Sequence, residues 1–419
     1  MNFNQQDVVH SNLTLPYYVQ EFIETKHFQR LKNIKQLGVT NVIFKTATSG
    51  RAQHCIGTAY LCKCLLDTLE KNSKFKIDEL HKKCVVLAGL LHDIGHGPFS
   101  HLWEGVVREG KYKTWTHEQQ SIEMINHMVT SYNIKLDNSP ENHEYALKLI
   151  FSLIAGDAKS WTQLLKPQEI FLTEIVSNKF CNVDVDKCDY LLRDTHYVRS
   201  MVEVKPFIEF LTRAKIVYDD DGTSHIGYHE NDFHLIENMF FNRAYFHNNI
   251  YQHYKVVGVE KMVRDILVKC DAGGFMLSDH RLSEVQSDPS KYLSLDDSVL
   301  EQIKDSNLDN QLMNDGKKIY ENLTKGKLYT MVWENLDEDK TIFKALIDKF
   351  GTIFCEVRKL IPSAEVPLNI PLYNDQGTRT SKKSNLKLSF KSTLIYCVDA
   401  DDVTVNNVKN FLNSLNNNM

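Results

Sequence analysis

The sequence lacks any apolar run long enough to cross a bilayer, and its start has neither the basic residues nor the apolar core of a secretory signal. It also lacks a CxxC pair. The nine cysteines are scattered and odd in number, which excludes a paired zinc or thioredoxin-like motif and favours a reducing compartment. The net charge of −5 indicates no broad nucleic-acid surface. We therefore expect an intracellular globular protein, in the cytoplasm or the nucleus, with no membrane partner.

Apolar residues at helical spacing dominate residues 19–210, and polar loops separate them. Residues 28–37, 56–69 and 147–154 each contain such a stripe, and Thr116 with Gln119 forms a capping pair that begins another helix. Residues 215–229 place short apolar arms around an Asp-Asp-Gly turn, which predicts a β-hairpin. Asn231 is predicted to cap a long helix that runs through Val263.

The pattern weakens after Gly273 into an α+β region, in which residues 392–402 read as a strand, residues 403–415 as a helix and residues 416–419 as a frayed tail. No repeat of fixed period is present. The sequence thus predicts a mainly α fold with a small β-hairpin and an α+β C-terminal region. We expect a catalytic domain at 1–272, with the hairpin as an insertion, and a smaller region at 273–419.

The segment LLHDIGHGPFSH at 90–101 carries the most chemistry. His92 and Asp93 are adjacent, so both side chains can converge on one ion only where a helix ends. The preceding residues 77–91 have helical apolar spacing, and the glycines and proline that follow end that helix. An imidazole nitrogen with a carboxylate oxygen suits a borderline divalent metal such as iron, manganese or zinc.

A metal held by one His-Asp pair would have too few ligands. His54 stands near the predicted start of a helix that follows Ser49 and Gly50, and Asp186 stands on a predicted helix further along the chain. Two imidazoles and two carboxylates would leave positions open for water, whose pKa such a metal lowers to about 7.

Each of these residues also has a simpler explanation. An His-Asp pair arises by chance, a lone His54 is commonly a capped or exposed histidine, and Asp186 could pair with a lysine or arginine one turn away. Their joint presence favours the metal site.

Several blocks in fixed order resemble one family. RAQH at 51–54, LLHDIGHGPFSH at 90–101, THEQ at 116–119, EIVSNK at 174–179 and DVDKCDY at 184–190 resemble the eukaryotic deoxynucleotide triphosphohydrolases with a sterile-alpha-motif and an HD domain. The resemblance covers about residues 7–270, thins toward the C-terminus and omits the sterile-alpha-motif domain. It implies a helical HD phosphohydrolase fold and hydrolysis of a dNTP to a deoxynucleoside and triphosphate.

The resemblance also implies roles for individual residues. Four resemble the metal ligands: His54, His92, Asp93 and Asp186. Five surround the reacting phosphate: His96, His101, Glu104, His117 and Glu118. His101 is the implied general acid for the departing 5′ oxygen, oriented by Glu104, while Glu118 supports His117. Four hold the triphosphate, with Mg²⁺ bridging its phosphates: Arg51, Lys187, Tyr190 and Arg243.

Five further residues resemble those that face the sugar and the base: Gln36, Leu37, Asp194, Tyr251 and Gln252. Tyr251 is implied to exclude a 2′ hydroxyl by its bulk, and Gln36 and Asp194 to bond the 3′ hydroxyl. The spacing of Tyr245, Phe246 and Tyr251 also fits a core stripe of a long helix, so that alternative stays open.

The chain departs from the family where the animal member binds activating nucleotides between subunits. Glu24 and Lys32 stand where the family reads guanine with aspartate and arginine, Asn248 and Asn249 replace two phosphate-binding arginines, and no lysine-valine pair precedes Gln6. We hypothesise that activation by GTP is lost or replaced. A homo-oligomer, dimer or tetramer, is still expected from the resemblance.

Three functions follow as hypotheses. The first is a metal-dependent dNTP triphosphohydrolase that lowers dNTP pools, with iron, manganese, zinc or magnesium at the His-Asp site. The second is an HD phosphohydrolase for another nucleotide, such as a monophosphate or a modified dNTP. The third is a non-catalytic HD protein that binds single-stranded nucleic acid, which the acidic net charge and the intact ligands disfavour, so nucleic acid is at most a secondary partner.

Overall fold

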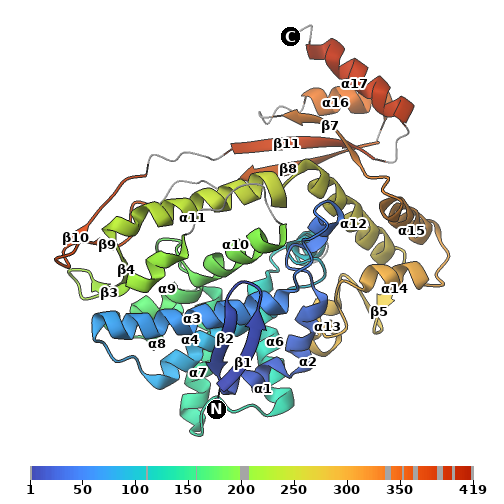
Figure 1. Cartoon of the computed structure of the whole chain (residues 1–419). Helices are drawn as coiled ribbons and strands as arrows, with labels where there is room; N and C mark the ends of the chain where they lie inside the picture. Colours follow the sequence, from blue (N-terminus) through green and yellow to red (C-terminus); the bar gives the residue numbers. More distant parts are fainter. Residues whose placement is uncertain are drawn as a thin grey trace.

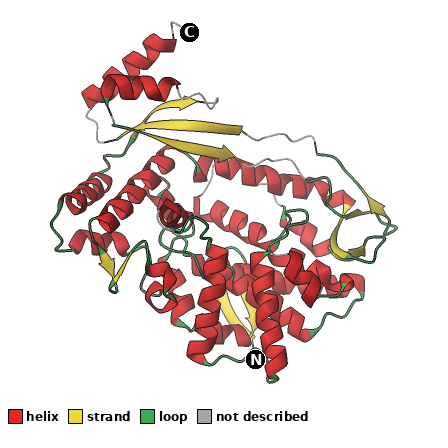
Figure 2. Ribbon diagram, turned by 180° about the vertical axis from the view of Figure 1, so that it is seen from behind, coloured by secondary structure: helices red, strands yellow, loops and turns green. Residues whose placement is uncertain are grey.

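Helices make up most of the described chain and pack around one large apolar core (Figure 1). The computed structural model describes residues 2–109, 112–156, 158–198, 207–335, 341–351, 353–361, 367–384, 390–398 and 402–416. Seen from behind, the helical body carries small strand pairs and a separate lobe at one end (Figure 2). The predicted mainly α class is confirmed.

Six helices frame the central part of the body: α3 (Arg51–Ser73), α4 (Glu79–Leu91), α5 (His101–Glu109), α6 (His117–Tyr132), α7 (Pro140–Ala155) and α10 (Val185–Val198). The predicted start of α6 is confirmed, because the Thr116 hydroxyl accepts a hydrogen bond from the Gln119 backbone N–H. The stripe in α7 ends at Gly156, whose φ of 67° only glycine adopts readily. The apolar faces predicted for α3 and α7 point into the core.

Short elements connect these helices: α1 (Tyr18–Ile23), α2 (Lys26–Gln29), η1 (Arg30–Asn33), η2 (Gly38–Val42), α8 (Ala158–Leu164), η3 (Pro167–Leu172), α9 (Thr173–Val176), η4 (Ile208–Arg213) and η5 (Glu230–Asp232). The predicted stripe at 28–37 is thus divided between short helices. Phe28, Leu31 and Ile34 are buried as expected, but Leu37 lies outside the first of these turns and is half-buried.

Two hairpins lie on the helical body. The N-terminal hairpin, β1 (Asn2–Asp7) with β2 (Ser11–Pro16), was not predicted, since its first strand is polar throughout apart from Phe3. The predicted hairpin is confirmed as β3 (Lys215–Tyr218) and β4 (Ser224–His229). Two late strands extend it, because β9 (Leu372–Tyr373) pairs in parallel with β4 and β10 (Arg379–Thr380) pairs with β9.

The long helix predicted from Asn231 through Val263 is interrupted, so that prediction was wrong in extent. Helix α11 (Phe233–Phe246) passes into the π-helical turn η6 (His247–Tyr251), and α12 (Tyr254–Ala272) begins after a break. At the break, His253 has an extended ψ of 133° and its side chain accepts from the Lys255 N–H, which caps the new helix. Tyr251 and Gln252 therefore stand at a bend.

Beyond α12, the chain adds short elements to the body: β5 (Met276–Leu277), β6 (His280–Arg281), η7 (Val285–Ser287), α13 (Pro289–Tyr292), α14 (Val299–Asp305) and α15 (Gln311–Thr324). The main core includes buried residues of this segment, among them Leu282 and Met313, and also Leu372 of β9. The division at residue 272 stays a prediction, and apolar packing runs across it.

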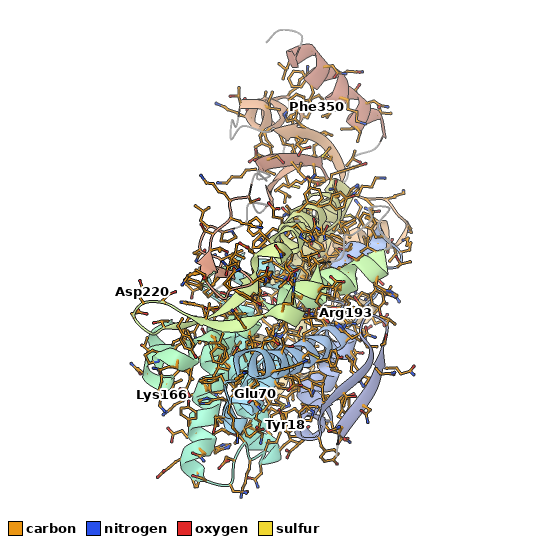
Figure 3. The ribbon with its side chains drawn as sticks, turned by 60° about the vertical axis from the view of Figure 1, so that its left-hand side comes forward. Tyr18, Glu70, Lys166, Arg193, Asp220 and Phe350 are labelled. Carbon is orange, nitrogen blue, oxygen red and sulfur yellow. The ribbon has the colours of Figure 1, made fainter. Side chains whose placement is uncertain are left out.

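The lobe at one end consists of β7 (Thr330–Asn335), α16 (Thr341–Phe350), β8 (Phe354–Ile361), β11 (Phe390–Cys397) and α17 (Asp402–Asn416). Its sheet has the order β7-β11-β8, and it has an apolar core of its own around Leu346 and Val408. Figure 3 places it, with Phe350, at the far end from Tyr18. The predicted late strand and helix are confirmed. Of the predicted tail, residues 417–419 lie outside the described residues.

Within the described residues, none of the helices combines the length and the apolar character that a bilayer crossing requires.

Candidate metal centre

Three helices bring the four predicted metal ligands together. His54 is in the first turn of α3, His92 and Asp93 follow directly after the last turn of α4, and Asp186 is in the first turn of α10. The bend that follows α4 lets the adjacent side chains of His92 and Asp93 point toward the same centre. The predicted places of His54 near the start of a helix and of Asp186 on a helix are confirmed, whereas His92 and Asp93 lie just beyond the helix whose last turn they were predicted to occupy.

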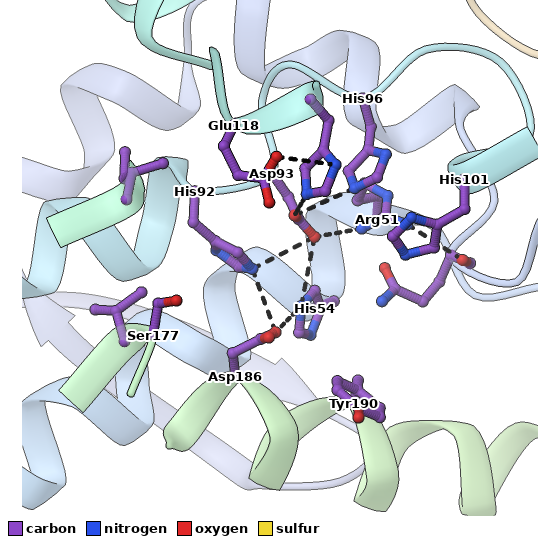
Figure 4. Close-up of a pocket in the computed structure, with 14 residues that line it drawn as sticks. Arg51, His54, His92, Asp93, His96, His101, Glu118, Ser177, Asp186 and Tyr190 are labelled. Carbon is purple, nitrogen blue, oxygen red and sulfur yellow. Dashed lines mark hydrogen bonds and ion pairs between the residues drawn. The ribbon is translucent and has the colours of Figure 1, made fainter. Parts of the chain in front are cut away.

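The ligand atoms are close enough to share one ion (Figure 4). His54 Nε2 lies 3.0 Å from Asp186 Oδ1 and 3.5 Å from Asp93 Oδ2. His92 Nε2 lies 3.3 Å from Asp186 Oδ1 and 3.4 Å from Asp93 Oδ2. Two imidazole nitrogens and two carboxylate oxygens from distant parts of the chain thus face one point.

Hydrogen bonds on the far side of each ring favour the metal-binding tautomer. His92 Nδ1–H donates to the Gly89 carbonyl at 2.9 Å, and His54 Nδ1 lies 2.8 Å from the Asp189 carboxylate. The Nε2 lone pairs then point at the centre. His92 Nε2 is buried and has no hydrogen-bond partner among the described residues. A buried nitrogen beside the carboxylates of Asp93 and Asp186 fits a divalent metal.

Charges around the centre keep the acids ionised. Burial alone would raise the pKa of Asp93, but the Arg51 guanidinium and the neighbouring histidines lower it well below its usual range. Burial likewise opposes ionisation of Asp186, yet the neighbouring His54 and His92 rings lower its pKa. Both groups are therefore anionic ligands at neutral pH, as metal binding requires.

Three further histidines stand beside the centre, as predicted. The rings of His96 and His117 stack with centroids 3.9 Å apart, and His101 meets His96 edge to face at 4.9 Å. Burial, Arg51 and His117 lower the pKa of His96, whose Nε2 lies 3.3 Å from Asp93 Oδ1. His101 is exposed at the cavity wall, and desolvation by the surrounding protein, with His117 and Arg51, lowers its pKa to about 4.

Glu104 contacts a different histidine from the one that the sequence suggested. Its carboxylate is hydrogen-bonded to His117 Nδ1 and accepts from the His117 backbone N–H at 3.3 Å, so it orients His117 rather than His101. The reason is geometric, because the start of α6 runs past the first turn of α5. Glu118, predicted to support His117, lies 3.6 Å from the same Nδ1.

The centre opens into a cavity of about 140 Å³. Eleven of its wall residues were predicted from the sequence: Gln36, Arg51, His54, His92, Asp93, His96, His101, His117, Glu118, Asp186 and Tyr190. Ile154, Val176 and Ser177 complete the wall and were not predicted as site residues. The EIVSNK block already contained Val176 and Ser177, so the resemblance offered a signal for them.

The predicted sugar side lies next to this cavity. The Tyr251 hydroxyl donates to Asp194 Oδ2 at 2.6 Å, and Tyr251 and Leu37 pack in one apolar cluster. Asp194 Oδ1 and Gln36 Oε1 are buried without hydrogen-bond partners among the described residues. Burial raises the pKa of Asp194 to about 7. Two unpartnered oxygens suit a ligand hydroxyl.

The remaining predicted phosphate and base contacts do not line the cavity. Lys187 is paired with Asp184 at 2.5 Å, and Gln252 lies 3.4 Å from His247. Arg243 is half-buried on α11, with its Nε unpartnered, and its charge acts against the burial that raises the pKa of Tyr190 to about 12.

Residues 94–101, here called the histidine loop, carry His96 and His101. Their backbone is held from outside the loop. The Arg30 guanidinium donates to the carbonyls of Ile94 and His96, each at 2.8 Å, and the Tyr292 hydroxyl donates to the Gly95 carbonyl at 2.9 Å. Asp297 accepts from the Phe99 N–H at 2.7 Å.

The loop has a backbone conformation that needs such support. Phe99 and Ser100 have φ of 58° and 60°, left-handed values that cost residues other than glycine about 1 kcal/mol or more. Gly95 and Gly97 allow its close packing, because a Cβ on Gly95 would lie 2.2 Å from the Ser121 nitrogen and one on Gly97 would strike Trp103. Arg30, Tyr292 and Asp297 were not predicted as site residues, since nothing in their sequence neighbourhood marks them.

Comparison with known proteins agrees with this geometry. The family described as the HD domain matches residues 51–189, the segment that contains all four metal ligands. The chain carries an HD domain.

Most of the chain is also similar to larger HD-domain proteins. It is 32% identical over 333 residues to the deoxynucleoside triphosphate triphosphohydrolase SAMHD1 homolog of Dictyostelium discoideum, covering 78% of this chain and 59% of that protein. It is 32% identical over 353 residues to SAMHD1 of Homo sapiens, covering 78% of this chain and 54% of that protein. A putative HD domain-containing protein of Acanthamoeba polyphaga mimivirus is 28% identical over 79% of this chain and 73% of its own length. The chain thus spans little more than half the length of its SAMHD1 relatives.

Proposed function

We propose that this HD-domain chain is a metal-dependent deoxynucleoside triphosphate triphosphohydrolase. The observation that carries the proposal is the convergence of His54, His92, Asp93 and Asp186 beside a cavity lined by three more histidines. The names of its relatives in Dictyostelium and in animals support the same activity.

The residues divide the chemistry among them. A divalent metal at the four ligands would supply Lewis acidity and a water of lowered pKa. Arg51 places a fixed positive charge at the wall of the cavity, where phosphate oxygens would gain negative charge. His101 faces the cavity, and we propose that it protonates the departing 5′ oxygen, with the negative triphosphate raising its low pKa. Glu104 and Glu118 hold His117 beside His96.

On the sugar side, we propose that Tyr251 excludes ribonucleotides by its bulk, while Asp194 and Gln36 bond the 3′ hydroxyl. Arg243, Lys187 and Tyr190 would hold the triphosphate together with Mg²⁺. Leu37 and Gln252 would contact the base. For Lys187 this role requires release from Asp184.

Other parts of the proposal concern the whole protein. We propose iron, manganese, zinc or magnesium at the centre, since the His and Asp ligands accept all four. We also propose a homo-oligomer, loss or replacement of activation by GTP, a domain boundary near residue 272, and an intracellular location that the nine free cysteines support. Sedimentation with and without GTP tests the oligomer, and a dNTPase assay with and without GTP tests the activation; strict dependence on GTP would contradict its loss.

The decisive experiment is to incubate the purified protein with each dNTP and NTP in Mn²⁺ and to resolve the products. Free triphosphate and a deoxynucleoside are expected. Release of phosphate or pyrophosphate would instead support an HD phosphohydrolase of another nucleotide class. No turnover, with salt-dependent binding of single-stranded nucleic acid, would support the non-catalytic alternative.

A further inference from the structure

Asp189, one helical turn after the metal ligand Asp186, receives hydrogen bonds from both sides of α10. Its Oδ2 accepts from the His54 Nδ1 at 2.8 Å and from Arg193 Nε at 3.0 Å. Its Oδ1 accepts from Arg193 Nη2 at 3.0 Å and from His10 Nε2 at 2.6 Å. The carboxylate is fully buried, so all of its partners are protein groups.

His10 comes from the turn of the N-terminal hairpin, far from the HD segment in sequence. Asp7 Oδ1 accepts from the backbone N–H groups of Val9 and His10, at 2.9 and 3.0 Å, and so shapes the turn. Asp7 Oδ2 accepts from Arg193 Nη1 at 2.9 Å. The hairpin turn thus contacts Asp189 directly through His10 and indirectly through Arg193.

The packing around Asp189 leaves little freedom. Helix α3 carries Gly57 at this point, and a Cβ there would lie 1.9 Å from Asp189 Oδ1. The His10 ring lies 5.5 Å from the Tyr60 ring on α3 and its side chain is only 6% exposed. The hairpin also docks through the buried Leu13 and Leu15, so apolar contacts already attach it to the body. Asp7 and His10 add buried polar contacts to this apolar attachment, and these contacts lead to Asp189.

We propose that His10 is a positioning residue for the metal centre, acting on the ligand His54 through Asp189. The His10 N–H fixes Asp189 Oδ1 and thereby aims Oδ2 at His54 Nδ1, which holds the His54 ring with its Nε2 toward Asp93 and Asp186. Loss of the His10 donor leaves Arg193 as the sole partner of Oδ1 and so weakens the fixation of the carboxylate that orients the His54 ring. This inference rests on the metal site of the proposed function.

The test is Mn²⁺ binding to the full chain, measured by electron paramagnetic resonance titration without nucleotide, with the melting temperature recorded for each variant. We expect His10→Ala to weaken Mn²⁺ binding about tenfold, which is the low end of the effect of losing a residue that supports a metal-binding histidine. His10→Gln, whose amide N–H can replace the lost donor, should restore most of the affinity.

Leu15→Val is the matched control, because it loosens the same hairpin without touching His10 or Asp189. It should lower the melting temperature and leave Mn²⁺ affinity unchanged. Equal Mn²⁺ affinity in His10→Ala and the wild type, or equal weakening by Leu15→Val, would overturn the inference. Since no nucleotide is present, a wild type that binds Mn²⁺ but hydrolyses no dNTP would remove only the proposed function.

Discussion

The metal centre and the histidine loop face each other across one cavity, yet different contacts hold them. At the metal centre, side chains hold side chains: Asp189 fixes His54, and Arg51 pairs with Asp93. In the loop, side chains hold the backbone: Arg30 binds the His96 carbonyl and Asp297 binds the Phe99 N–H. These contacts do not involve the imidazole rings of the loop. The first kind of contact can be predicted from the residue types at helix ends. The second kind cannot be predicted from the sequence of the loop itself.

The sharpest way to isolate the metal centre is to remove one charged ligand. Asp186→Ala should lower both metal occupancy and turnover by at least about 100-fold, because two histidines then face a single carboxylate. Metal content after gel filtration, measured by mass spectrometry, checks it. Asp67→Ala, on the exposed face of α3, is the control and should retain its metal. Full occupancy in Asp186→Ala would contradict the site.

Removing a support of the histidine loop should affect catalysis without affecting metal binding. Asp297→Ala removes the acceptor of the Phe99 N–H and should lower kcat about 10- to 100-fold by displacing His96 and His101, while Mn²⁺ affinity stays within about twofold. Steady-state kinetics beside a metal titration checks it. Asp296→Ala, the neighbour that caps its own turn through Ser298, should leave kcat near wild type. A loss of metal in Asp297→Ala would mean that the halves are not separable.

Glu104 tests the contact that joins the loop's helix to α6. Burial would raise its pKa, but the hydrogen bond with His117 lowers it from 4.5 to about 2. Since the folded pKa is the lower one, this carboxylate stabilises the protein above pH 4.5, and the contribution is lost as the pH falls toward 2.

Glu104→Gln should therefore cost about 2 kcal/mol of unfolding free energy at neutral pH and progressively less below pH 4.5. Urea unfolding across this range measures the difference. Glu118→Gln, whose more exposed carboxylate lies 3.6 Å from the same nitrogen, should cost less. A cost that does not change with pH would show that the ionised form of Glu104 is not what stabilises the fold.

The smallest effect is expected on the sugar side. Tyr251→Phe keeps the ring and removes the hydrogen bond to Asp194, so kcat/KM for a dNTP should fall about three- to tenfold while the preference over the NTP persists. Tyr245→Phe, in the same apolar cluster, should change neither kcat/KM for the dNTP nor the preference over the NTP. A loss of sugar preference in Tyr251→Phe would assign the discrimination to the hydroxyl instead of to the ring.

The comparison also explains what the sequence could and could not predict. His54, His92, Asp93 and Asp186 were found because metal chemistry restricts both residue type and helix position. Asp189 was within reach, since it lies three residues after Asp186 on the same helix face.

The other supports had no such signal. Asp297 and Tyr292 act on backbone groups nearly two hundred residues earlier in the chain, and local patterns do not encode such pairs. The N-terminal hairpin escaped because its first strand is mostly polar, and the break at Gln252 because apolar spacing continues across it. The partner of Glu104 was misassigned because His101 is its neighbour in the sequence, whereas His117 is the residue that it contacts in the fold.

The attachment of the loop to Tyr292 and Asp297 has a consequence for how this chain can be shortened. A fragment that stops near residue 272 would retain every proposed ligand and every histidine of the cavity, but it would lack Tyr292 and Asp297 and the core residues Leu282 and Met313. The backbone of the histidine loop would lose these two supports, so such a fragment is expected to show no turnover. Adding the missing segment back as a separate peptide would then be a direct assay for how the catalytic histidines are assembled.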